Sequence, residues 1–219
     1  MSVNKENYRQ LTTELNDKAT LVAISKTKPV EEIKELYDLG QRDFGENYVQ
    51  ELIDKQAQLP KDIRWHFIGH LQSNKVKYIA PFVHLIHGVD SFNLLKEINK
   101  QAIKNNRVID CLLQIYIAKE ETKFGLSDDE LNEIITQLPE LKNVSVKGLM
   151  GMASFTNDTK KVKEEFHHLK TLYSTINDQH PTFNILSMGM SADYKIAIEE
   201  GSNMVRIGSL LFGERDHAK

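Results

Sequence analysis

In this sequence of 219 residues, Lys26 lies where a lysine can do covalent chemistry. It directly follows residues 21–25, an apolar run that is typical of a buried strand. A lysine at the end of a buried strand is desolvated, and desolvation favours the neutral amine that attacks a carbonyl carbon. The position therefore suggests a Schiff-base lysine. A lysine that extends from the rim of the fold into solvent is the alternative.

Two loops near the end of the sequence have the composition of an anion site. Residues 187–191 (SMGMS) and 207–209 (IGS) contain glycines, which let backbone N–H groups approach an anion, and Ser191 and Ser209 add hydroxyl donors. Neither loop contains a lysine or an arginine, so neutral donors and a helix dipole would hold a phosphate there. Alternatively, Ser191 caps the following helix and Gly208 forms a tight turn.

Two further polar residues interrupt or follow apolar runs. Arg206 lies within residues 204–207, a run that is otherwise wholly apolar, and a guanidinium is almost never buried without an acceptor. The acceptor is either an acidic side chain of the protein or a ligand atom such as a ring nitrogen. Asn47 follows a short strand. Its side chain either lines the same site as Lys26 or, together with Gln50, caps the helix that begins there.

The segments that carry these residues alternate between short β-branched runs and longer stretches with helical periodicity, which is an α/β pattern. After a leading helix near residues 5–16, the pattern predicts eight strands separated by helices, at 20–25, 42–44, 65–68, 84–89, 109–117, 145–152, 184–188 and 203–207. This favours one domain over residues 1–219, a (β/α)8 TIM barrel with an extra N-terminal helix, and an open doubly wound sheet is the alternative. In such a barrel the active site lies at the C-terminal ends of the strands, where Lys26, Ser191 and Gly208 fall.

The composition narrows the possible functions. Lysine and arginine total 28 against 31 aspartate and glutamate, a net charge of -3, which argues against a nucleic-acid-binding surface. The single cysteine, Cys111, excludes an internal disulfide and a cysteine-based zinc cluster, and the histidine spacing near His66 does not favour a metal site. The lack of a long apolar segment or a signal-peptide pattern predicts a cytoplasmic protein that does not insert into a membrane.

Five blocks of the sequence closely resemble the pyridoxal phosphate homeostasis protein family, the relatives of the alanine racemase barrel that bind pyridoxal 5'-phosphate (PLP). The blocks extend over almost the whole chain and are 23–28 (AISKTK), 44–51 (FGENYVQE), 65–75 (WHFIGHLQSNK), 187–191 (SMGMS) and 204–208 (MVRIG). The resemblance implies an alanine racemase N-terminal-domain-like barrel. It also implies that Lys26 holds PLP as a Schiff base and that Arg206 faces the pyridine nitrogen. The phosphate would be bound by Ser191, Gly208 and Ser209, and family members often have threonine in place of Ser209.

The family's role implies vitamin B6 homeostasis in the cell, in which the protein holds the reactive aldehyde in a protected form and passes it to apo PLP-dependent enzymes without robust turnover. An arginine at the pyridine nitrogen weakens carbanion stabilisation. The second domain with which alanine racemases compensate is absent from this sequence, so we expect a monomeric carrier. The alternatives are a PLP-dependent amino-acid racemase of narrow scope, a Schiff-base aldolase, and a scaffold that binds partner proteins according to PLP status.

Overall fold

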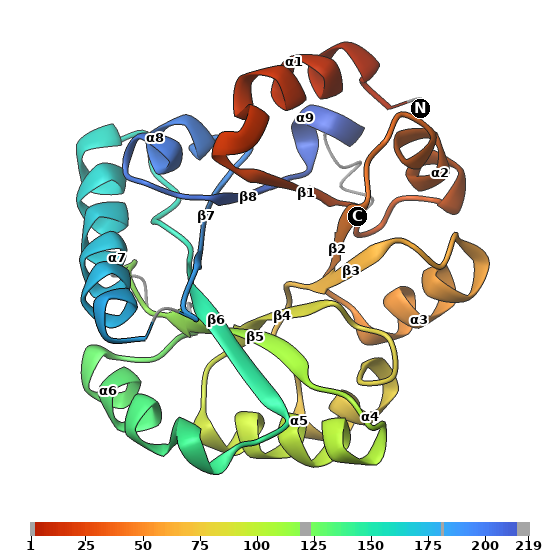
Figure 1. The fold of residues 1–219 in the computed structure, drawn as a ribbon. Coiled ribbons are helices and arrows are strands. Elements are labelled where there is room, and N and C mark those ends of the chain that lie inside the picture. Colours follow the sequence, from red (N-terminus) through yellow and green to blue (C-terminus); the bar gives the residue numbers. More distant parts are fainter. Residues whose placement is uncertain (1–2, 119–123, 181, 214–219) are drawn as a thin grey trace.

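The computed structural model describes residues 3–118, 124–180 and 182–213 and is a closed barrel of eight parallel strands (Figure 1). The strands follow one another around the barrel in chain order, and they are β1 (Thr20–Ile24), β2 (Asp43–Glu46), β3 (Arg64–Phe67), β4 (Leu85–Val89), β5 (Ile109–Ile115), β6 (Val144–Gly151), β7 (Ile185–Met190) and β8 (Met204–Ile207). Pairing of β8 with β1 closes the ring. The (β/α)8 prediction is confirmed, and the open doubly wound alternative is wrong.

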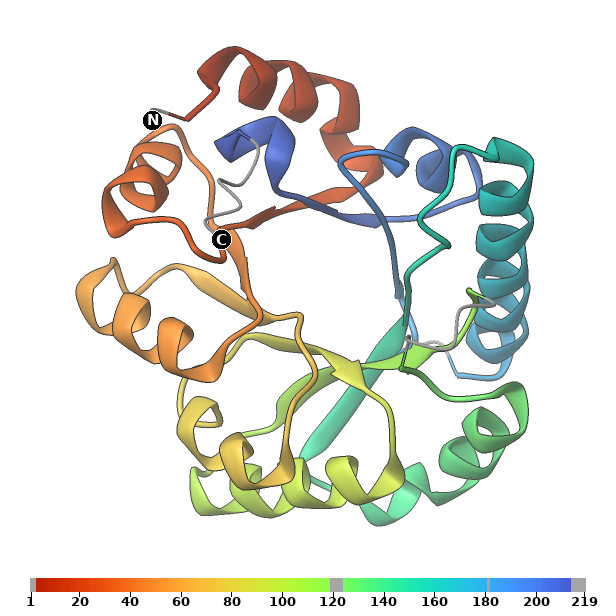
Figure 2. The same cartoon turned by 180° about the vertical axis from the view of Figure 1, so that it is seen from behind.

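The helices surround the barrel and connect successive strands (Figure 2). They are α1 (Lys5–Leu15), α2 (Val30–Asp38), α3 (Val49–Gln58), α4 (Val76–Ile79), α5 (Phe92–Lys104), α6 (Asp128–Gln137), α7 (Thr159–Gln179), α8 (Tyr194–Glu199) and α9 (Ser209–Phe212), with 3-10 turns at Asn16–Lys18, Ser73–Lys75 and Leu138–Glu140. The predicted extra N-terminal helix is α1. It packs beside α9, and Asn4 N–H donates to Leu211 O at 2.8 Å.

The described residues form one barrel, but the predicted domain over residues 1–219 also includes residues 1–2 and 214–219, which lie outside the described part of the chain. The domain limits therefore stay a prediction. Among the described helices, none combines the length and the apolar character that crossing a bilayer requires.

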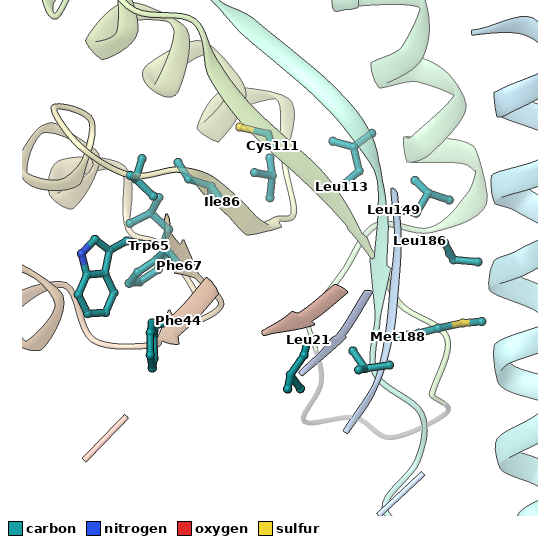
Figure 3. Packing of buried hydrophobic residues seen from close by; sticks show 14 of the residues in the cluster. Leu21, Phe44, Trp65, Phe67, Ile86, Cys111, Leu113, Leu149, Leu186 and Met188 are labelled. Carbon is teal, nitrogen blue, oxygen red and sulfur yellow. The ribbon is translucent and has the colours of Figure 1, made fainter. Parts of the chain in front are cut away.

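Alternation of side chains along the strands produces two separate apolar cores. Outward-facing residues pack against the helices, and Figure 3 shows part of this layer. There Phe44 of β2 and Trp65 of β3 occupy paired positions, with ring centroids 6.1 Å apart. The smaller core fills the barrel interior and consists of Val22, Ile24, Leu85, Leu112, Met150 and Met204. Burial of apolar area in both layers is the main contribution that stabilises such a fold.

Polar side chains share the barrel interior with the smaller core. His87 lies two residues after Leu85, and Arg206 lies two residues after Met204, so both side chains point inward with these apolar neighbours. His66 pairs in register with Leu85 and is also buried. Buried polar groups require hydrogen-bond partners, so these side chains must bond to one another or to a ligand.

Candidate functional site

A cavity of about 650 Å³ opens at the C-terminal ends of the strands. It is lined by all six residues that the sequence assigned to a site, namely Lys26, Asn47, Ser191, Arg206, Gly208 and Ser209. A second cavity, of about 640 Å³, lies at the opposite end of the barrel and includes none of the six among its lining residues. The fold therefore brings the predicted residues together at the end of the barrel where such folds place their ligands.

The backbone on both sides of Lys26 is fixed by hydrogen bonds to α3. Lys55 Nζ donates to Ser25 O at 2.7 Å, and Thr27 N–H donates to Glu51 Oε1 at 2.5 Å. Lys55 Nζ also donates to Glu51 Oε1, at 2.6 Å. Thr27 has a φ of 65°, a left-handed conformation that a β-branched residue rarely adopts. One helix thus determines where the side chain of Lys26 leaves the strand.

The buried carboxylate of Glu46 links the end of β1 to α3. Glu46, the last residue of β2, is fully buried and accepts hydrogen bonds from Lys55 Nζ at 2.8 Å and from Ser25 Oγ at 2.6 Å. Burial raises the pKa of Glu46, and the charge and hydrogen bond of Lys55 oppose that rise. This pair was not among the predicted site residues. The available signal was a glutamate in an apolar block with a lysine in the facing helix.

The two glycine-containing loops meet at the cavity, as the anion-site hypothesis requires. Ser191 Oγ accepts a hydrogen bond from Gly208 N–H at 3.2 Å, and Ser209 begins the short helix α9 beside it. Asp193 is the N-cap residue of α8, and its carboxylate accepts a hydrogen bond from Met190 N–H at 2.6 Å. The interpretation of Ser191 as the cap of that helix is therefore wrong.

Gly208 has an ordinary backbone conformation, with a φ of -118°, so its conformation does not require a glycine. A Cβ atom at this position would lie 3.5 Å from Ile24 Cβ, which is a normal van der Waals distance. The tight-turn interpretation thus fails to explain the residue. Gly208 lines the cavity, and its N–H group lies within hydrogen-bond distance of Ser191 Oγ.

Asn47 lines the cavity and does not cap a helix. The N-cap residue of α3 is Tyr48, without a side-chain cap hydrogen bond, so the cap interpretation of Asn47 is wrong. Asn47 Oδ1 is buried and has no hydrogen-bond partner among the described residues. Leaving a buried amide oxygen unpaired is costly, and a ligand group in the cavity would remove that cost. The neighbouring loop packs closely here, because a Cβ at Gly69 would lie 2.4 Å from Asn47 O.

Arg206 is buried at the cavity and bonded to uncharged acceptors. Nη1 donates to Ser187 O at 3.0 Å and to Ser187 Oγ at 2.7 Å, and Nη2 donates to Gly151 O at 3.0 Å. Among the described residues, none of these acceptors is a carboxylate, so the first of the two alternatives for the partner of Arg206, an acidic side chain, is not found in contact with it. Burial lowers the pKa of Arg206 to about 10, against an opposing effect of Asp193, so the guanidinium remains protonated at neutral pH. Of its five N–H groups, Nε–H and one Nη2–H remain for a ligand.

The histidines near residue 66 lie in two different places. His70 lines the cavity, whereas His66 is buried inside the barrel. Asp43, His66 and His84 offer metal-ligand atom types within 4.8 Å of one another. Both oxygens of Asp43 are, however, hydrogen-bonded to the guanidinium of Arg64, which satisfies the carboxylate without a metal ion.

Comparisons with known proteins agree with this geometry. Residues 3–216 match the family model "Alanine racemase, N-terminal domain". A pyridoxal phosphate homeostasis protein of Aquifex aeolicus is 45% identical over 91% of this chain and 88% of its own length, and one of Escherichia coli K12 is 37% identical over 93% and 88%.

Similar solved structures point to the same family. PipY of Synechococcus elongatus has a TM-score of 0.90 at 35% identity, covering 95% of this chain and 99% of its own, and a second PipY structure, with PLP bound, has a TM-score of 0.88 at 36% identity over the same shares. An alanine racemase of Clostridium difficile shares the fold at 16% identity and a TM-score of 0.81, and this chain covers 57% of it. The chain therefore belongs to the alanine racemase N-terminal domain family and, within it, to the pyridoxal phosphate homeostasis proteins.

Proposed function

We propose that this protein binds PLP in the cavity of about 650 Å³, holds it covalently at Lys26, and serves PLP homeostasis in the cytoplasm as a monomeric carrier without robust turnover. The observation that carries the proposal is that a lysine, a cup of neutral anion donors and a buried arginine line one cavity. The names of the relatives and the PLP-bound PipY structure support the same ligand.

The residues of the cavity match the functional groups of PLP. When bound, PLP supplies an aldehyde with which a primary amine condenses. Lys26 provides that amine from a backbone held by α3. Ser191 and Ser209 provide two hydroxyls for a phosphate, and Gly208 adds a backbone N–H, which in this structure donates to Ser191 Oγ at 3.2 Å. No cation is needed for such contacts. Asn47 Oδ1 is an unused acceptor that a ligand hydroxyl or N–H can satisfy.

Arg206 supports a carrier in preference to an enzyme. A pyridine nitrogen that faces a protonated guanidinium accepts a hydrogen bond and stays unprotonated, because the guanidinium keeps its own proton. An unprotonated ring withdraws electrons weakly, so the site protects a bound aldehyde without strongly promoting reactions at a substrate carbon.

The test of the proposed function measures transfer and turnover side by side. The purified protein, loaded with PLP, is mixed with an apo PLP-dependent enzyme, and the recovery of that enzyme's activity is compared with recovery from free PLP at equal concentration. In parallel, the loaded protein is incubated with L-amino acids. We expect activation of the apoenzyme and no racemisation, decarboxylation or transamination above a PLP blank. Robust turnover of an amino acid would overturn the carrier assignment in favour of an enzyme.

Gly208→Ala tests the anion cup without disturbing the fold. The new methyl group fits against Ile24, so the thermal unfolding temperature should stay at the wild-type value. Because Gly208 lines the cavity, the added methyl group would crowd a phosphate bound there, so PLP affinity should fall roughly tenfold to a hundredfold. Equilibrium titration by absorbance measures this loss.

Two variants at position 209 are the controls for this substitution. Ser209→Thr keeps the hydroxyl and should bind PLP like the wild type, whereas Ser209→Ala should be weaker. Wild-type affinity in Gly208→Ala would show that the phosphate lies elsewhere.

A further inference from the structure

A continuous series of hydrogen bonds crosses the inside of the barrel and ends on Arg206. Asp43 Oδ1 lies 3.0 Å from His66 Nε2, and His66 Nδ1 lies 2.9 Å from His87 Nε2. His87 Nδ1 lies 3.4 Å from Ser187 Oγ, which accepts a hydrogen bond from Arg206 Nη1 at 2.7 Å. All five residues are buried, with at most 7% of any of them exposed, so water does not compete for these bonds.

This series, which we call the interior chain, consists of Asp43, His66, His87, Ser187 and Arg206. Its two ends belong to different cavities. Asp43 lines the cavity at the N-terminal ends of the strands, where Arg64 donates to both of its carboxylate oxygens. Arg206 lines the opposite cavity together with Lys26. The interior chain therefore connects a carboxylate at one end of the barrel with the proposed PLP site at the other.

The charged end at Asp43 determines which atoms donate along the interior chain. Burial alone would raise the pKa of Asp43, but hydrogen bonds from Arg64 and His66 outweigh it and lower the pKa to about 2. The ionised carboxylate can only accept, so His66 Nε2 must carry a hydrogen. In a neutral His66 ring, Nδ1 is then an acceptor and requires a donor on His87.

His87 meets this requirement in one tautomer only. Burial lowers the pKa of His87 well below its usual range, so the ring is neutral and has a single N–H group. That group is Nε2–H, which donates to His66 Nδ1 and leaves Nδ1 to accept the hydroxyl hydrogen of Ser187. The lone pairs of Ser187 Oγ are then free to accept from Arg206. With a single hydrogen on His66, at Nε2, every hydrogen in the interior chain points from Arg206 towards Asp43.

We propose that His87 is a positioning residue for Arg206: it orients the hydroxyl of Ser187 as an acceptor for the guanidinium, whose remaining N–H groups then face the cavity. His66 and Asp43 act one step further away, because they select the tautomer of His87. The role of this arrangement in cofactor binding rests on the proposed function, whereas the tautomers are a property of the protein alone.

Nitrogen NMR on the wild-type protein without added PLP tests the tautomers directly. In uniformly ¹⁵N-labelled protein, we expect His66 to carry a hydrogen on Nε2 and to accept at Nδ1, and we expect the neutral ring of His87 to carry its hydrogen on Nε2. A His87 ring with its hydrogen on Nδ1, or a doubly protonated His66 ring, would overturn the proposed direction. This measurement needs no variant and does not depend on whether PLP binds.

Two substitutions of His87 separate positioning from mere packing. His87→Phe keeps a ring of similar size but removes both nitrogens, and PLP affinity should fall about tenfold with a changed absorption maximum of the bound cofactor. His87→Asn places an amide near the former Nδ1, so it restores the contact with Ser187 and should stay within about threefold of wild-type affinity. Wild-type affinity and an unchanged spectrum in His87→Phe would overturn the positioning role.

Asp43→Asn extends the test to the far end of the barrel, with Asp62→Asn as its matched control. Asp62 also binds an arginine, accepting a hydrogen bond from Arg42 Nε at 2.9 Å, but it is not part of the interior chain. Asp43→Asn should shift the ¹⁵N signals of His66 and His87 and weaken PLP binding severalfold, whereas Asp62→Asn should do neither. Equal effects of the two variants would contradict transmission through the interior chain. Failure of the wild type to take up PLP would instead reject the proposed function. The NMR measurement of the tautomers would still test the interior chain.

Discussion

Lys26→Ala is expected to lose all covalently held PLP, from about one group per chain in the wild type to none. The reason is that Lys26 supplies its amine from the end of β1, and α3 holds the backbone on both sides of it. Alanine leaves the anion cup and Arg206 in place, so PLP should still bind reversibly but more weakly. The visible absorption band that a lysine-bound PLP produces should disappear, and titration followed by gel filtration should leave no cofactor on the protein.

Lys28→Ala is the matched control, because Lys28 lines the same cavity. Its Nζ donates to Phe212 O at 2.8 Å, which joins the loop after β1 to α9. We expect this variant to keep the band and the covalent stoichiometry of the wild type. Loss of the band in Lys28→Ala with retention in Lys26→Ala would show that the wrong lysine has been assigned.

Lys55→Met should produce the largest loss of stability, about 3–5 kcal/mol near neutral pH. The substitution removes the cation that pairs with Glu46 and leaves a fully buried carboxylate without a counter-charge. It also removes the hydrogen bond to Ser25 O and thereby loosens the backbone next to Lys26. Denaturant unfolding of wild type and variant gives the difference, and a loss below about 1 kcal/mol would contradict the account.

The cost of Lys55→Met should depend on pH in one direction. The folded-state pKa of Glu46 is already raised above its usual value of 4.5 by burial, and removal of Lys55 raises it further. A group with a raised folded pKa contributes stability that is present below the unfolded pKa and is lost as the pH rises through the folded value. The difference between variant and wild type should therefore shrink as the pH falls towards 4.5 and grow as it rises.

Glu46→Gln in the Lys55→Met background supplies the control for this explanation. It removes the charge that the single substitution leaves unpaired, and replacing both members of a buried ion pair is close to neutral for stability in many proteins. Most of the lost stability should return, and the pH dependence of the difference should vanish. A double variant as unstable as Lys55→Met would show that shape, and not charge, limits this position.

The site residues at strand ends were predictable from the sequence, because a barrel brings the C-terminal ends of all its strands to one end of the fold. Each apolar run predicted a strand, and the polar residue after it fell at the C-terminal mouth, as with Lys26, Asn47 and Ser191. The short helix α9 and the cap residues were harder to predict. Asp193 and Tyr48 took the cap positions that the sequence suggested for Ser191 and Asn47, because helix starts shift by a residue or two with the loop geometry.

The interior chain and the Glu46–Lys55 pair were not predicted, for a different reason. His66, His87 and Ser187 come from three strands, and only the closed ring brings them together inside it. Glu46 looks like any polar residue at a strand end until the structure shows it facing α3 and not the barrel interior. Such contacts depend on which side of a strand each residue faces, and strands this short leave that side uncertain in a sequence.

Borohydride reduction of the purified, PLP-loaded wild-type protein, followed by peptide mapping by mass spectrometry, shows whether Lys26 holds PLP covalently. Reduction makes a lysine-bound pyridoxyl group permanent, so its position can be read from the peptide that carries the added mass. We expect one modified peptide, the one that contains Lys26, with the modification on that residue. A protein that takes up no PLP, or an adduct confined to another lysine, would contradict it.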